Sequence, residues 1–135
     1  MTMISKILLI DDDETSNFIT EKQLKRLNVS NEIITVLNGL EAKNYVLNCV
    51  DLPPLALVDI NMPIMTGFEF LDWFEHSKFK GQCKFSIYST SIRMEDREKA
   101  NQFSDVICYI EKPLTEEKIH KIFQAFPHKK GQPEI

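Results

Sequence analysis

Cysteine is scarce in this chain, and long apolar runs are missing. The 135 residues include three cysteines, Cys49, Cys83 and Cys108, which are odd in number and widely spaced. This set argues against a disulfide scaffold and a zinc site, and fits reduced thiols in the cytoplasm. No apolar stretch reaches the roughly 18 residues that a membrane-spanning helix needs. The first ten residues, MTMISKILLI, show no signal-peptide cleavage site, so we expect a cytoplasmic protein without a membrane partner.

Positive charge is not in excess either. Lys and Arg number 16 against 20 Asp and Glu, which gives a formal net charge of −4. We therefore expect no nucleic-acid partner, because such partners are bound by basic surfaces. Internal repeats and low-complexity linkers are also missing, and the length fits about one domain. We expect one domain over residues 1–127, without an output domain, and a polar tail over 128–135.

Short apolar runs alternate with helix-like stretches along the chain. Five runs have the composition of buried parallel strands, namely Lys6–Ile10, Glu32–Leu37, Leu55–Asp59, Phe85–Ser89 and Val106–Ile110. Three later stretches carry apolar residues at helical spacing: Ala42, Tyr45, Val46 and Cys49; Phe70, Leu71 and Phe74; Ile119, Ile122, Phe123 and Phe126. Two weaker helices are expected over 14–28, with a stripe of Ile19, Leu24 and Leu27, and over the largely charged 94–103. The alternation predicts an α/β fold, a doubly wound parallel sheet with helices on both faces.

Polar residues follow four of the five expected strands. Asp11 and Asp12 follow the first, Asp59 ends the third, Ser89 ends the fourth, and Lys112 follows the fifth. Parallel strands end at the same edge of a sheet, where ligands bind in such folds, so these side chains should meet. Clustered carboxylates repel one another unless a cation lies among them, and hard oxygen ligands favour Mg²⁺ over zinc or copper. The set indicates phosphoryl transfer onto or past a carboxylate.

The same residues carry a resemblance to a known family. Asp11-Asp12 after ILLI, the stretch DINMPIMTG from Asp59, Ser89, and Lys112-Pro113 together resemble a response-regulator receiver domain over residues 4–126. The resemblance implies a five-stranded flavodoxin-like sheet with strand order 2-1-3-4-5. Within DINMPIMTG, Pro63 should stop the strand from continuing, and Gly67 should let the chain turn into the next helix.

The resemblance also implies how the site works. Asp59 is the expected phosphoacceptor. Asp12 is expected to bind Mg²⁺ directly and Asp11 largely through water, with Asp59 and the Asn61 backbone carbonyl completing the metal ligands; Mn²⁺ is a possible substitute. Lys112 is expected to pair with one phosphoryl oxygen.

Switching residues follow from the same resemblance. The Ser89 hydroxyl is expected to bond another phosphoryl oxygen and to move inward after phosphorylation. Tyr109 matches the family's switch aromatic, although packing in a buried strand explains it nearly as well. Asn61 and Ser91 occupy the positions that tune the rate of dephosphorylation. Ser89 stands where Thr is commoner in the family, and Thr66 replaces a frequent aspartate before Gly67; both departures leave every reacting group in place.

The implied partners are proteins. A sensor histidine kinase or a histidine phosphotransfer protein should donate the phosphoryl group, and a downstream protein should bind the face made by the fourth helix, fifth strand and fifth helix. A phosphorelay intermediate or phosphate sink is an alternative that the sequence leaves open. The domain should catalyse its own phosphorylation and dephosphorylation without a separate substrate. A haloacid-dehalogenase-type phosphatase is a remote alternative, because its nucleophile precedes its acidic pair, whereas here Asp11 and Asp12 precede Asp59.

Several other residues have plainer interpretations. Asp13 is expected to cap the first helix or to be solvated. Tyr88 is assigned to the core, and Met62 and Met65 to packing. The histidines His76, His120 and His128 are expected at the surface rather than in phosphoryl transfer.

Overall fold

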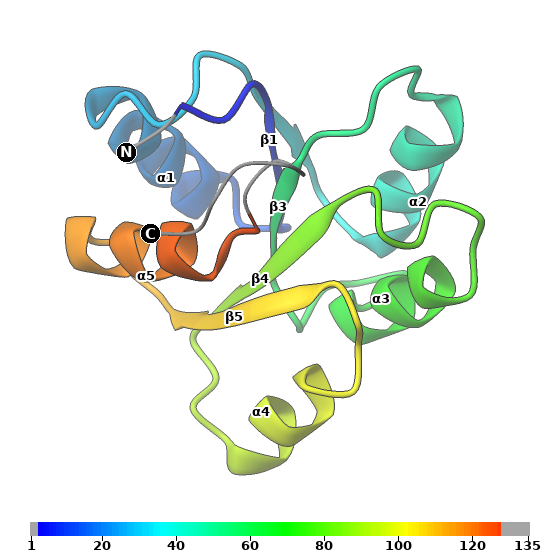
Figure 1. Ribbon diagram of the computed structural model, residues 1–135. Coiled ribbons are helices and arrows are strands. Elements are labelled where there is room, and N and C mark those ends of the chain that lie inside the picture. The colour runs from blue at the N-terminus through cyan, green and yellow to red at the C-terminus, as the bar shows by residue number, and fades with distance from the viewer. Residues whose placement is uncertain (1–2, 128–135) are drawn as a thin grey trace.

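A five-stranded parallel sheet with the order β2-β1-β3-β4-β5 forms the centre of the molecule (Figure 1). The structure is a computed structural model that describes residues 3–127. The strands are β1 (Ile7–Ile10), β2 (Ile33–Val36), β3 (Leu55–Val58), β4 (Lys84–Ser89) and β5 (Val106–Glu111). The helices are α1 (Glu14–Arg26), α2 (Gly39–Asn48), α3 (Gly67–Glu75), α4 (Met94–Ala100) and α5 (Glu116–Ala125). The predicted fold class and strand order are confirmed, whereas the expected tail over 128–135 lies outside the described residues.

The predicted elements have the right centres and slightly different ends. The first three strands are shorter than expected, so Asp59 lies just after β3 and Leu37 after β2. Four helices also end earlier than predicted: α1 at Arg26 rather than 28, α2 before Cys49, α4 at Ala100 rather than 103, and α5 before Phe126. Residues 101–103 continue as turns whose amide groups bond carbonyls in the last turn of α4.

Helices cover both faces of the sheet, and each face has its own apolar core. Figure 1 shows α1 and α5 on one side of the sheet and α2, α3 and α4 on the other. The first core, under α2, α3 and α4, contains Ile10, Val58, Phe70, Phe74 and Phe85. The second core, under α1 and α5, contains Leu9, Leu57, Tyr88, Leu114 and Ile119. Neighbouring strand residues divide between the two cores because strand side chains alternate. Within residues 3–127, no helix could cross a membrane.

The inner face of α1 differs from the predicted apolar stripe. Ile19 is 52% exposed, so its assignment to the stripe is wrong, while Leu24 is buried as expected. Asn17 and Thr20 are buried in its place. Both have hydrogen-bond partners inside the protein, which offsets the cost of burying polar groups. The face of α1 that meets the sheet is therefore partly polar at its end nearest Asp11.

The turn from β3 into α3 brings that helix against the backbone of Asp59. Gly67 is the first residue of α3, and its amide donates to the carbonyl of Ile60 over 3.0 Å. A Cβ atom on Gly67 would lie 2.1 Å from the carbonyl oxygen of Asp59, which no side chain can accommodate. Thr66 and Glu69 close the helix start with a capping box. The absence of a side chain at Gly67 thus allows α3 to begin beside Asp59.

Replacing Gly67 with alanine is expected to lower the free energy of unfolding by about 1–3 kcal/mol, because the backbone must shift to relieve the overlap. Urea unfolding measures this directly. Asp72→Ala, at an exposed position of the same helix, is the matched control and should change stability by less than about 0.5 kcal/mol. Equal stability of the Gly67→Ala and wild-type proteins would contradict the close approach.

Candidate functional site

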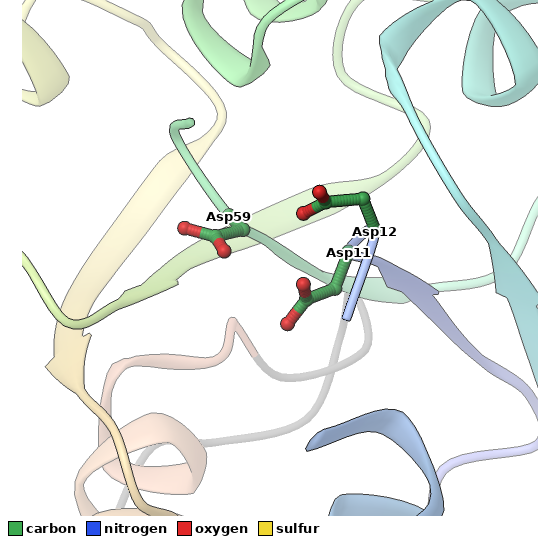
Figure 2. A group of neighbouring side chains, drawn as sticks. All are labelled: Asp11, Asp12 and Asp59. Atoms are coloured by element: carbon green, nitrogen blue, oxygen red, sulfur yellow. The ribbon is translucent and has the colours of Figure 1, made fainter. Parts of the chain in front are cut away.

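Three carboxylates meet at the carboxyl edge of the sheet. Asp11 and Asp12 follow β1 and Asp59 follows β3, and these strands are neighbours with Ile10 opposite Val58. The amide of Asp59 donates to the carbonyl of Ile10 over 2.9 Å, which extends the pairing to the ends of the strands. One oxygen from each carboxylate lies within 4.8 Å of the others (Figure 2). The predicted acidic cluster is therefore present.

The three carboxylates differ in their exposure to solvent. The side chain of Asp11 is 4% exposed and that of Asp59 is 13% exposed, whereas Asp12 is exposed. Burial raises the pKa of Asp11, although the hydrogen bonds from Lys112 and from the amide of Asp13 favour its ionised form. Asp59 keeps one oxygen bound to the amide of Ile60 at 2.7 Å. The site is thus buried on the Asp11 side and exposed to solvent on the Asp12 side.

Lys112 reaches the cluster from the end of β5. Its ammonium donates to a carboxylate oxygen of Asp11 and lies 3.2 Å from Oδ2 of Asp59. Burial by itself lowers the pKa of Lys112, but its bond to Asp11 and the charges of Asp59 and Asp11 outweigh burial and raise it. Lys112 is therefore charged at neutral pH. Lys112 contacts two of the three carboxylates, so excess negative charge remains for a cation to offset.

The donor set fits a hard divalent cation. Carboxylate oxygens are the ligands that Mg²⁺ prefers, and Mg²⁺ usually keeps several waters, for which the exposed side of Asp12 leaves access. Asn61 lies two residues after Asp59 in an exposed part of the loop. Its backbone carbonyl is on the same chain segment as Asp59, and its role as a metal ligand stays a prediction. The oxygen chemistry of the site is that expected for Mg²⁺ or Mn²⁺.

Ser89, Ser91 and Tyr109 form a hydrogen-bonded chain beside the carboxylates. Ser89 is 1% exposed, and its hydroxyl accepts from the amide of Ser91 at 3.2 Å. The carbonyl of Ser91 accepts from the Tyr109 hydroxyl at 3.0 Å, and the Ser91 hydroxyl donates to Asp96 at 2.5 Å. The guanidinium of Arg97 lies 4.4 Å from the centre of the Tyr109 ring. The structure thus connects the two residues predicted to switch, Ser89 and Tyr109, through Ser91, which was predicted to tune the rate of dephosphorylation.

The residues that were predicted to lie outside the site, such as Asp13 and Met62, can also be compared with the structure. Asp13 caps α1 by accepting from the amide of Ser16 at 3.1 Å, and Met62 is buried in the first core, as predicted. His76 and His120 are exposed, as expected, and His128 lies outside the described residues. Tyr88 is in the core, but its hydroxyl is hydrogen-bonded in a way that the sequence interpretation missed. Because the hydroxyl of a buried tyrosine usually has a hydrogen-bond partner, the assignment of Tyr88 to the core could have predicted one.

Comparison with known proteins identifies the family of the chain. The family model for the response regulator receiver domain matches residues 7–124. The chain belongs to this family. The sensor histidine kinase CheAY of Helicobacter pylori is 33% identical over 112 residues, which are 82% of this chain and only 13% of that kinase.

Two solved structures are similar over most of their length. A two-component response regulator from Cytophaga hutchinsonii has a TM-score of 0.83 and 29% identity, and the match covers 90% of this chain and 96% of that one. The phosphorylated cyanobacterial phytochrome response regulator RcpA has a TM-score of 0.75 and 27% identity, with 88% of each chain covered. The fold of this chain is therefore that of response regulators whose structures have been solved.

Replacing Asp11 with asparagine is expected to raise the urea midpoint at pH 7 in metal-free buffer. The pKa of Asp11 is higher in the folded protein, so its contribution to stability is complete below its ordinary pKa and is lost as pH rises through the folded-state pKa. Asparagine removes the buried charge and keeps an oxygen for the amide of Asp13. Asp13→Asn, at an exposed helix cap, is the control and should be nearly neutral. A lower midpoint for Asp11→Asn would contradict this account.

Proposed function

We propose that Asp59 accepts a phosphoryl group from a phosphohistidine of a sensor histidine kinase or phosphotransfer protein, in a Mg²⁺-dependent reaction. The observation that carries this proposal is the position of Asp59 between an acidic pair and a charged lysine. Membership of the receiver family and the phosphorylated state of RcpA support it. The free cysteines and the two-component setting of the family support a cytoplasmic location.

In the proposed transfer, an Asp59 oxygen attacks phosphorus, an O–P bond forms, and the N–P bond of the phosphohistidine breaks. Asp11, Asp12, Asp59 and the Asn61 carbonyl would hold Mg²⁺, which offsets charge on the phosphoryl oxygens when bound. Lys112 already lies 3.2 Å from Asp59 and would turn from the carboxylate towards a phosphoryl oxygen. The amide of Ile60 holds the other Asp59 oxygen and so orients the carboxylate for attack.

The switch follows from the loop after β4. The Ser89 hydroxyl would leave the amide of Ser91 for a phosphoryl oxygen, and that exchange would move the loop inward. Tyr109 is bonded to the same loop and stacks with Arg97 of α4, so a moved loop changes the surface of α4, β5 and α5. A downstream protein binds this face in one of the two states, which is a population shift. Hydrolysis of the acyl phosphate resets the domain, at a rate set by Asn61 and Ser91, without turnover of a separate substrate.

Asp59→Asn is expected to abolish Mg²⁺-dependent labelling by a small-molecule phosphodonor such as acetyl phosphate. The amide cannot form the acyl phosphate, although the shape of the side chain is retained. Intact-protein mass spectrometry measures the labelled fraction, with and without a chelator. Asp72→Asn, at an exposed position of α3, is the control and should be labelled like the wild-type protein. Full labelling of Asp59→Asn, or labelling that survives the chelator, would refute the assignment.

A further inference from the structure

Tyr88 is a buried polar residue at the junction of three segments. It lies in β4, directly before Ser89, and is 5% exposed. Its hydroxyl oxygen accepts from the amide of Leu114 at 3.0 Å and lies 3.1 Å from Oγ1 of Thr20 in α1. Either hydroxyl can be the donor between Tyr88 and Thr20, because the phenolic oxygen keeps both a proton and a second acceptor position beside the bond from Leu114. One hydroxyl therefore joins β4, α1 and the segment between β5 and α5.

That last segment carries Lys112. The amide of Lys112 donates to the carbonyl of Ser89 over 2.9 Å, and the amide of Leu114 donates to the Tyr88 hydroxyl. The backbone on both sides of Pro113 is thereby fixed to two consecutive residues of β4. The ammonium of Lys112 also lies 5.4 Å from the centre of the Tyr88 ring, within the range of a cation–π contact. We infer that Tyr88 is a positioning residue that holds Lys112 in place for phosphoryl transfer.

Polar residues on α1 complete the same arrangement. The amide group of Asn17 donates to the carbonyl of Asp11 at 2.8 Å, and that of Gln23 donates to the carbonyl of Leu114 at 3.3 Å. With Thr20, these residues are spaced by three along the helix and face the sheet from one side. Figure 1 shows that α1 and α5 lie on the same side of the sheet. The polar stripe of α1 thus connects the Asp11 segment to the Leu114 segment, and Tyr88 is its contact with β4.

Packing alone does not explain a tyrosine at this position. An aliphatic residue would fill the second core but would leave the buried amide of Leu114 and the hydroxyl of Thr20 without this partner. Leu114 and Thr20 are each 2% exposed, so solvent cannot replace it. In the described part of the chain, every buried side-chain nitrogen and oxygen has a hydrogen-bond partner. The hydroxyl of Tyr88 is therefore a specific connection to the segment that carries Lys112.

The inference rests on the proposed function, and Tyr88→Phe tests it with the full chain. This variant keeps the ring and removes the hydroxyl, so the Lys112 segment loses one of its two attachments to β4. Labelling by acetyl phosphate at saturating Mg²⁺ should slow by about tenfold, less than the roughly hundredfold cost of a 1 Å misplacement. The three carboxylates themselves are unchanged in this variant, so labelling should still require Mg²⁺ and should be lost with a chelator. Tyr45→Phe, in α2, is the control and should label at the wild-type rate.

A double-mutant cycle separates positioning of Lys112 from a general loss of packing. If Tyr88 acts through Lys112, removing its hydroxyl should have little further effect on the rate in a Lys112→Ala background. The same factor in both backgrounds, or a wild-type rate for Tyr88→Phe, would overturn the inference. If Tyr88→Phe does not fold, Thr20→Val decides, since it removes the partner of the hydroxyl: slower labelling supports the inference and the wild-type rate overturns it. Absence of labelling in the wild-type protein would instead overturn the proposed function and this inference together.

Discussion

The structure depends on holding three carboxylates and one ammonium at the edge of a parallel sheet. Strands β1 and β3 are adjacent, so the chain has no means of separating Asp11 from Asp59 while both cores stay packed. Asp11 is the most buried of the three, and its raised pKa shows that folding works against its charge. Lys112 offsets part of this cost. What remains is a site where a divalent cation would relieve the repulsion that the fold imposes on the carboxylates.

The end of β4 connects this site to both faces of the domain. Consecutive strand residues point to opposite faces, so Ser89 reaches the loop before α4 while Tyr88 reaches α1 and the segment before α5. A displacement of Ser89 would therefore act on Tyr109 through the loop, whereas Tyr88 keeps the Lys112 segment attached to β4. In the proposed account, the face that carries α4 changes with phosphorylation, whereas the face that carries α1 and α5 maintains the position of Lys112 for transfer.

Much of this arrangement could be predicted from the sequence. The alternation of apolar runs with helical patterns predicts a parallel sheet, and a parallel sheet places Asp11, Asp12, Asp59, Ser89 and Lys112 at one edge whatever the loops do. The prediction that was wrong concerns which residues of α1 face the sheet. Hydrophobicity favours Ile19 over Thr20 as the buried residue, but Thr20 is buried because the Tyr88 hydroxyl lies opposite it. Hydrogen bonds between residues 68 positions apart leave no periodic signal in the sequence.

Stability measured with and without Mg²⁺ tests most directly the claim that the carboxylate cluster is built for a divalent cation. If the cluster binds Mg²⁺ in the folded state alone, the free energy of unfolding should rise with its concentration, by about 2.7 kcal/mol at a hundred times the dissociation constant. Replacing Asp12, the exposed member, with asparagine should strongly reduce that rise. A wild-type protein whose urea midpoint is the same at every Mg²⁺ concentration would contradict the account.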